Sequence, residues 1–375
     1  MSGANSIVPE PIARQPWGML IPLFLLVAFG AAVLHSAAGG SMQPFANSHL
    51  IRFAVFLLMA SIIASLPREF VKFMTYPAYI GVLLLLVAVE VLGQVRGGSQ
   101  RWIDLGPIVL QPSELMKPVI VIVLARFYAA LPVGMITDWR ALLIPAGLIL
   151  FPVAFVLLQP DLGTSLAIMF GGAVVMLLAG LPMRWFVGGG VLAAIAAPLA
   201  FFFALEDYQR RRVMTLFDPE SDPLGAGYHI AQSKIAIGSG GIVGKGFNQG
   251  SQSHLQYLPE PHTDFVFATM AEEWGLIGGL FVIGVFAIIL RWGTRVALAS
   301  RDRFSSLVAA GMVATIFFYI AVNLMMVMGM APVVGIPLPF MSHGGSSMMT
   351  NMICIGGLMM VNRWNRNAPR SGLVR

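Results

Sequence analysis

The acidic residue Asp264 stands where a long polar stretch meets a new apolar run. The polar stretch ends in PEPHTD, and the apolar run reads FVFATMAEEWGLIGGLFVIG. Proline on both sides of Glu260 makes this turn rigid. A carboxylate held beside apolar side chains becomes more basic, which suits a general base at neutral pH. We therefore expect Asp264 to do chemistry; His262 is the rival base, and a simple helix cap at Asp264 is the structural alternative.

Other charged residues lie where apolar runs begin or end, and each has a structural alternative. Glu114 and Lys117 are three residues apart and can pair on one helical face, so an ion pair and a substrate role are about equally supported. Arg101 beside Trp102 fits an interfacial anchor or a fork for a diphosphate. Asp161, in QPDLGTS, fits a divalent-cation ligand or, slightly better, a helix cap.

Two further segments have features of anion-binding sites. The sequence MSHGGSS places Ser342, His343 and Ser346 around two glycines, which resembles a nest for an anion at a helix start. Arg210 opens a run of three arginines in the long polar stretch and is a further candidate to bind phosphate. We expect these residues to contact an anionic substrate.

The composition indicates that membrane helices hold these residues. The chain has 375 residues, of which 57% are hydrophobic and 11% charged, against about 25% charged residues in soluble domains. We predict an all-α polytopic membrane protein with one domain over residues 1–375. The net charge of +6 is expected to set topology and to bind membrane lipids rather than nucleic acid. Cys354 is the single cysteine, which excludes an internal disulfide.

Ten apolar stretches approach the roughly 20 residues that cross a bilayer. The first loosely resembles a cleavable signal peptide, but the polytopic remainder favours an uncleaved first helix. The predicted transmembrane helices cover approximately 17–36, 50–66, 73–93, 113–131, 141–158, 163–181, 185–204, 264–291, 305–329 and 346–362.

Most arginines and lysines of the short connections lie on one side of this arrangement, so both termini are predicted to be cytoplasmic. The large loop 205–263, between helices 7 and 8, is then extracytoplasmic. The loops after helices 3, 5 and 9 lie on the same side and are rich in glycine, proline and serine. Irregular backbone at membrane depth packs in protein or lines a cavity. We expect one shared extracytoplasmic cavity that contains Asp264.

Several long motifs, in this order, resemble the SEDS family (shape, elongation, division, sporulation) of bacterial wall synthesis. The resemblance covers essentially residues 17–362 and is closer to the RodA branch than to the FtsW branch. His343 and Trp274 are mild departures, at positions where the family often has tyrosine and leucine. The motifs are GSQRWIDLG with QPSELMK, QPDLGTS, DPESDPLGAGYH, YLPEPHTDFVFATMAEEWG and APVVGIPLPFMSHGGSS.

The resemblance implies a ten-helix peptidoglycan glycosyltransferase in the bacterial cytoplasmic (inner) membrane, with its active site outside. The substrate would be lipid II, a disaccharide-pentapeptide on undecaprenyl pyrophosphate. The family's catalytic aspartate falls on Asp264, and its other motif acids and lysine fall on Glu114, Lys117 and Asp161. A class B penicillin-binding protein is the implied partner.

An inverting transfer needs one base and a group that stabilises the departing charge. Asp264 would be the base. Arg101, Lys117 or Arg210 would stabilise the pyrophosphate, with Mg²⁺ or Mn²⁺ as a possible cofactor at Asp161 or Asp264; no organic cofactor is expected.

Two other functions remain open from the sequence. A lipid II flippase or transporter requires charged residues deep in the membrane and an alternating cavity. The few intramembrane charges and the one-sided polar loops disfavour it. A non-catalytic scaffold for the penicillin-binding protein is the third possibility, in which Asp264 would serve only as a helix cap.

Overall fold

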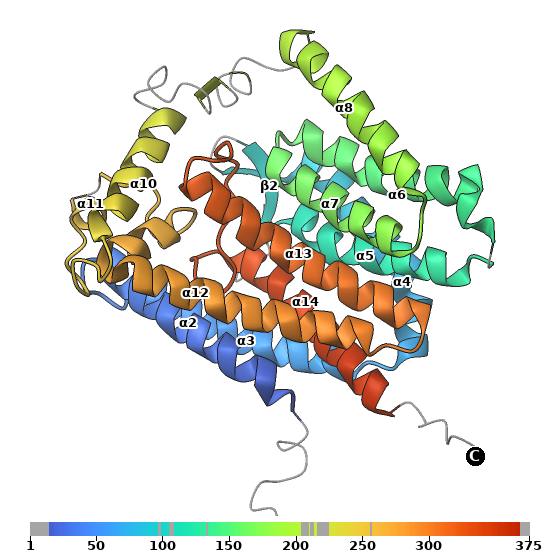
Figure 1. The fold of residues 1–375 in the computed structure, drawn as a ribbon, viewed down its shortest axis with the longest axis horizontal. Helices are drawn as coiled ribbons and strands as arrows, with labels where there is room; N and C mark the ends of the chain where they lie inside the picture. The colour runs from blue at the N-terminus through green and yellow to red at the C-terminus, as the bar shows by residue number, and fades with distance from the viewer. Residues whose placement is uncertain are drawn as a thin grey trace, which may run out of the picture.

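In a computed structural model of the chain, long helices run side by side with short connections (Figure 1). The structure describes residues 15–96, 99–104, 109–132, 134–203, 210, 214–215, 225–255 and 257–367.

Each predicted transmembrane segment overlaps one long helix. Seven helices of the described ranges (α2, α3, α4, α6, α8, α12 and α13) are long and apolar enough to cross a membrane, and α7 is a shorter apolar helix. The chain is therefore a mostly helical, multi-pass membrane protein. The long helices are α2 (Trp17–Ala37), α3 (Phe45–Ser65), α4 (Arg68–Leu92), α5 (Pro112–Ala130), α6 (Trp139–Leu158), α7 (Leu162–Leu178), α8 (Met183–Phe203), α12 (Val266–Leu298), α13 (Arg303–Val327) and α14 (Gly345–Asn367).

The connection after α4 contains three short strands, which the all-α prediction did not include. Strands β1 (Gln94–Arg96), β2 (Ser99–Asp104) and β3 (Val109–Leu110) form an antiparallel sheet in the order β1-β2-β3. Backbone amides and carbonyls that leave a helix near the membrane need partners. Pairing within this short sheet provides them, and it needs no periodic apolar pattern that would have revealed the strands.

The large polar segment 205–263 is described in part. It contains α10 (Ala226–Gly240) and the short α11 (Ser251–His254). Residues 204–209, 211–213, 216–224 and 256 of this region lie outside the described residues. Helix α10 packs on α12, and both α10 and α11 lie at the end of the bundle where α12 begins (Figure 1).

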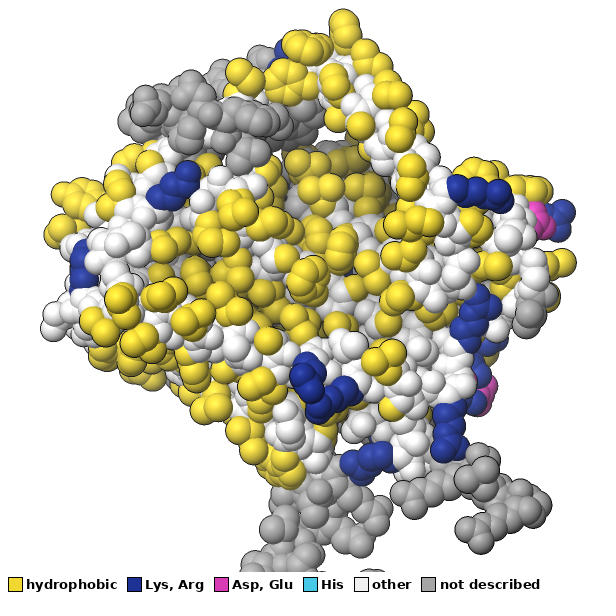
Figure 2. Space-filling view, in the orientation of Figure 1, with side chains coloured by type: hydrophobic (Ala, Val, Ile, Leu, Met, Phe, Trp, Pro, Cys, Tyr) yellow, Lys and Arg dark blue, Asp and Glu magenta, His cyan; other side chains and the backbone are white. Residues whose placement is uncertain are grey.

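Helix α13 is the central element of the bundle because it packs on α5, α7, α12 and α14. Helix α8, by contrast, leans away from the other helices and leaves its apolar side chains exposed (Figure 1). Figure 2 shows apolar side chains across the middle of this face, whereas lysine and arginine gather mainly towards the end opposite α10 and α11. This is the charge distribution from which the sequence predicts topology.

Helix α12 is interrupted near its start by Gly275, whose backbone (φ 62°, ψ −158°) is not helical. Such a conformation is open essentially only to glycine. The loop after α10 bonds to the interrupted turn. The Lys245 amide donates to the Glu272 carbonyl (3.0 Å), and the Leu276 amide donates to the Gly241 carbonyl (2.9 Å). The polar loop therefore fixes the direction of the first two turns of α12, which directly follow Asp264.

Candidate active site

Asp264 lies just before α12 and leaves its carboxylate available. The helix begins at Val266, its N-cap position is Phe265, and no side chain caps it. The cap interpretation of Asp264 is therefore wrong. Among the described residues the Asp264 carboxylate has no hydrogen-bond partner. A carboxylate in this state can accept a proton from a bound hydroxyl group without first breaking a bond within the protein.

The backbone of Asp264 is held by a buried amide side chain from the central helix. Asn323 on α13 donates from Nδ2 to the carbonyl of Asp264 (2.8 Å) and to the carbonyl of Ile336 (2.7 Å). Asn323 is fully buried. One side chain thus joins the segment before α12 to the segment between α13 and α14.

The residues just before Asp264 bond to the same segment. Ser342 donates from Oγ to the carbonyl of Thr263 (2.6 Å), and the backbone amide of His343 donates to the carbonyl of His262 (2.8 Å). Two segments about 80 residues apart in the chain are therefore joined at three successive positions. Ser342 and His343 thus lie beside His262 and Asp264, and their role in binding an anionic substrate stays a prediction.

The surroundings of Asp264 make its carboxylate more basic. Burial, followed by the nearby carboxylate of Glu260, raises the pKa of Asp264 to about 6. The side chain keeps partial access to solvent, so a substrate can reach it. A group with this pKa is mostly ionised at neutral pH and is a stronger base than an ordinary aspartate.

His262 faces the cavity side of the same turn. Its ring stacks on Phe45 with centroids 3.9 Å apart and planes 15° apart, and its Nε2 lies 3.6 Å from Oε2 of Glu260. Burial lowers the pKa of His262, and Glu260 partly opposes this effect. The neutral ring is therefore favoured at pH 7, and His262 forms an aromatic wall beside the base.

Glu114 and Lys117 form a buried ion pair that includes a third residue. Lys117 Nζ lies 2.6 Å from Glu114 Oε1 and 2.6 Å from the hydroxyl of Tyr319. The Tyr319 hydroxyl donates in turn to the other oxygen of Glu114. The two charged side chains are only 1% and 8% exposed. This closed cluster favours the structural interpretation, in which the pair ties α5 to α13.

The hydrogen-bonding groups of Arg101 and Asp161 are directed to nearby protein atoms rather than to an open site. Asp161 accepts from the amide of Thr164 at the start of α7 (3.1 Å) and from Gln111 Nε2 (2.9 Å). Arg101 donates to the carbonyls of Gln159 (2.7 Å) and Pro160 (2.5 Å), with Nη1 3.8 Å from the Asp161 carboxylate. The predicted cap at Asp161 is confirmed.

The residues around Asp161 and Asp264 do not fit a metal centre of several protein ligands. Within the described ranges no three His, Cys, Asp or Glu side chains are grouped for a metal ion. Mg²⁺ can also be held by one carboxylate together with substrate phosphates. A role for Asp264 of that kind stays a prediction, and no step derived below depends on a metal.

The remaining two candidates are not brought to Asp264. Arg210 donates to the carbonyl of Phe202 (2.9 Å) at the end of α8 and has no other hydrogen bond or ion pair with described residues. Ser346 donates over 3.4 Å to the carbonyl of Val109 in β3. Their predicted contact with substrate stays a prediction, and Ser346 lies in the first turn of α14.

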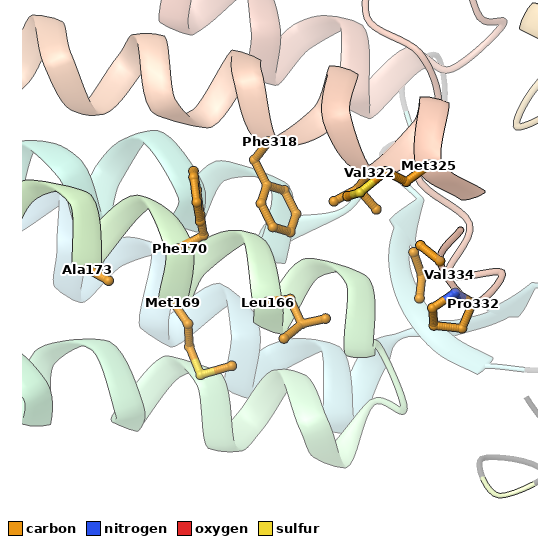
Figure 3. Close-up of a pocket in the computed structure, with 10 residues that line it drawn as sticks. Leu166, Met169, Phe170, Ala173, Phe318, Val322, Met325, Pro332 and Val334 are labelled. Atoms are coloured by element: carbon orange, nitrogen blue, oxygen red, sulfur yellow. The ribbon is translucent and has the colours of Figure 1, made fainter. Parts of the chain in front are cut away.

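An apolar groove lies close to Asp264, between α7 and α13 (Figure 3). It has a volume of about 480 Å³, and Leu166, Phe318 and Val334 line it. Val334 precedes Gly335, which approaches the base so closely that a Cβ atom there would lie 3.5 Å from Oδ2 of Asp264. One end of the groove is therefore lined by the residue next to Gly335, the glycine that adjoins the carboxylate.

A second cavity, of about 580 Å³, lies on the other side of the PEPHTD turn. Phe45, His254, Glu260 and His262 are among the residues that line it, so both polar and aromatic groups face its interior. Asp264 follows this turn directly. The base thus follows within two residues of a side chain, His262, that lines this mixed polar and aromatic cavity.

Sequence reasoning missed Arg52, Asn323 and Tyr319 as residues of this region. Tyr319 and Asn323 are four residues apart, on one face of α13, within an otherwise apolar helix. Polar side chains inside a transmembrane helix are a signal of function or of a buried polar network, and this signal was available. Arg52, on α3, is close to His343, but no local motif marks it.

Comparisons with known proteins agree with one another. A family model described as a cell cycle protein, covering FtsW, RodA and SpoVE, matches residues 16–367. The peptidoglycan glycosyltransferase MrdB of Escherichia coli (strain K12) is 41% identical over 358 residues, 94% of this chain and 95% of the relative. Stage V sporulation protein E of Bacillus subtilis (strain 168) is 39% identical over 289 residues, 76% of this chain and 77% of the relative.

Solved structures give the same result. One match is a chain from a peptidoglycan synthase complex whose structure concerns the coordination of polymerization and crosslinking. It has a TM-score of 0.82 and 33% identity, over 94% of this chain and 99% of that one. The crystal structure of the rod shape determining protein RodA of Thermus thermophilus matches with a TM-score of 0.71 and 30% identity, over 93% of this chain and 97% of that one.

Proposed function

The chain belongs to the FtsW/RodA/SpoVE family of cell cycle proteins, and on that premise we propose how it acts as a peptidoglycan glycosyltransferase of cell elongation. One observation carries the proposal. The Asp264 carboxylate has no hydrogen bond to the described protein and has a pKa of about 6. It adjoins Gly335, whose neighbour Val334 lines the apolar groove, and it follows His262, which lines the polar cavity. This is the arrangement that a base needs when its substrate has a lipid tail and a sugar head.

In the proposed reaction Asp264 accepts the proton of the acceptor sugar's 4-hydroxyl group. The freed oxygen attacks the anomeric carbon of the donor sugar from the face opposite the leaving group. The new glycosidic bond forms as the bond to the pyrophosphate oxygen breaks, and the electron pair leaves with the polyprenyl pyrophosphate. One displacement inverts the anomeric centre. The three backbone contacts of residues 262–264 keep the base in place during this step.

The two cavities support a placement for lipid II. Its polyprenyl tail would lie in the groove between α7 and α13, where Leu166, Phe318 and Val334 offer an apolar lining (Figure 3). Its sugars would occupy the cavity beside Phe45 and His262, whose stacked rings provide a flat aromatic wall. Both positions bring the reacting atoms to Asp264.

Topology and partner are part of the proposal. We expect ten transmembrane helices, with loop 205–263 and Asp264 extracytoplasmic and both termini cytoplasmic; the lysine and arginine side chains gathered away from α10 and α11 support this orientation (Figure 2). The similarity to a synthase complex that couples polymerization with crosslinking supports a class B penicillin-binding protein as the partner.

A reconstitution experiment tests the function. The protein is inserted in liposomes with labelled lipid II and its penicillin-binding partner, and glycan strands are separated by length. We expect strands from the wild type and none from Asp264→Asn. Movement of labelled lipid II across the bilayer without strand formation would instead support a flippase. Strands formed equally by Asp264→Asn would exclude this residue as the base and leave the scaffold interpretation for its contacts.

A further inference from the structure

A cation near the base has no acidic partner in the described structure. Arg52, two turns into α3, points Nη1 at Nε2 of His343 over 3.1 Å. This is its one hydrogen bond among the described residues, and it has no ion pair there. The guanidinium is half-buried. Most of its five N–H donors therefore remain available.

This guanidinium lies at the start of a long helix. A Cβ atom at Gly345, the first residue of α14, would lie 3.7 Å from the guanidinium carbon of Arg52. The first turn of a 23-residue helix presents free amides and a positive partial charge. A cation at this end is unfavourable in isolation, and an anion held between the two removes the repulsion.

A second unpartnered side chain lies beside Arg52. His49 is three residues earlier on the same face of α3 and only 1% exposed. Neither of its ring nitrogens has a hydrogen bond of normal geometry, although the backbone of Phe340 and Ser342 interacts with the ring as a hydrogen-bond acceptor. A buried imidazole with incomplete hydrogen bonding is costly, and a polar ligand would complete it.

His343 completes the cluster as a neutral group. Burial, followed by the nearby charge of Arg52, lowers the pKa of His343 to about 4. Its Nε2 therefore accepts from Arg52 and keeps the guanidinium oriented, while the Ser48 hydroxyl lies 3.5 Å from Nδ1. Its backbone amide is the one that bonds to His262, two residues before the base.

We propose that Arg52, His49 and the first turn of α14 bind the diphosphate of a lipid-linked substrate. The inference rests on the proposed function and names a cation for it. Arg101 and Lys117 donate to protein carbonyls, a carboxylate and a phenol, whereas most N–H donors of Arg52 have no acceptor among the described residues. A guanidinium group can donate two parallel hydrogen bonds to one phosphoryl group.

Binding of farnesyl diphosphate to the purified chain in detergent micelles tests the site. Arg52→Gln removes the charge, Arg52→Lys keeps it without the fork, and Arg140→Gln is a matched control because Arg140 is an exposed arginine beside Trp139 at the start of α6. Farnesyl monophosphate and farnesol are the ligand controls. Thermal unfolding of each variant shows that it is folded.

We expect farnesyl diphosphate to bind Arg52→Gln at least about tenfold more weakly than the wild type, as for a lost charge-assisted hydrogen bond. Arg52→Lys should be intermediate, and Arg140→Gln unchanged. Equal affinity in the wild type and Arg52→Gln would overturn the site. Repeating the titration in Asp264→Asn separates the two proposals, because diphosphate binding there should persist even though polymerisation is lost.

The diphosphate has two possible sources, the donor strand and the acceptor lipid II. Lipid II with a blocked 4-hydroxyl group can act only as a donor. If Arg52→Gln reduces incorporation of blocked lipid II at saturating acceptor, the site serves the donor. If it raises only the KM of unmodified lipid II, the site serves the acceptor. An effect on neither would contradict the proposal.

Discussion

Replacing Lys117 alone should destabilise the protein far more than replacing Lys117 and Glu114 together. Both side chains are nearly inaccessible and 2.6 Å apart. Lys117→Met leaves the carboxylate of Glu114 buried, with the Tyr319 hydroxyl as its remaining side-chain partner. Removing one member of a buried pair costs about 3–5 kcal/mol, whereas replacing both by apolar groups of similar volume is often neutral.

The double variant Glu114→Leu/Lys117→Met is the informative member of this cycle. Its thermal midpoint in detergent should return close to that of the wild type, with Lys117→Met and Glu114→Leu both well below it. The coupling free energy follows from the four midpoints. Polymerisation by the folded double variant then separates the two roles left open by the sequence.

Two results would refute the structural interpretation of this pair. One is a Lys117→Met protein as stable as the wild type, which would mean that the cluster contributes nothing to folding. The other is a double variant with wild-type stability and no polymerisation. In that case Lys117 or Glu114 contacts substrate, and the closed cluster opens when lipid II binds.

Four further predictions concern the base, its support and the helix that follows it. Polymerisation should fall as pH drops through about 6, because Asp264 acts as the ionised form of a group with that pKa; a rate independent of pH between 5 and 7.5 would contradict this. Because the pKa of Asp264 rises from 3.8 to about 6 on folding, the ionised carboxylate destabilises the folded state by about 3 kcal/mol above pH 6. Asp264→Asn should therefore be more stable than the wild type at pH 7.5, by an amount that vanishes below pH about 4. Asn323→Ala loses both hydrogen bonds to the Asp264 and Ile336 carbonyls. The value of kcat should therefore fall severalfold or more, with little change in folding as monitored by fluorescence. A wild-type kcat would show that the base is held by other contacts. Gly275→Ala should cost about 1–3 kcal/mol because φ is +62°, and a midpoint unchanged from the wild type would show that the helix interruption can close.

The helices and the base were accessible from the sequence because their signals are local. Apolar runs of sufficient length mark α2 to α8 and α12 to α14. The rigid PEPHTD turn marks Asp264. The Asp161 cap likewise follows from residues within one turn of each other. Motif resemblance added the reaction class, which no single residue specifies.

The cation proposed to bind the diphosphate could not be identified from the sequence, because its position depends on contacts between distant segments. Arg52 meets His343 across 291 positions of the chain, and the sequence has no local signal for that pairing. Arg101 and Lys117 looked suitable for a diphosphate by type and position. The fold instead directs Arg101 to carbonyls of the turn before α7 and Lys117 to Tyr319. Residue type alone does not show whether a donor is already occupied.

The central claim is that Asp264 takes the proton in glycan polymerisation. The most direct measurement is strand formation from lipid II by the purified protein with its penicillin-binding partner, for the wild type, Asp264→Ala and Asp264→Asn, each with a thermal midpoint to confirm folding. We predict strands from the wild type alone, with both variants folded. Full activity of both folded variants would contradict the claim and remove Asp264 from the chemistry.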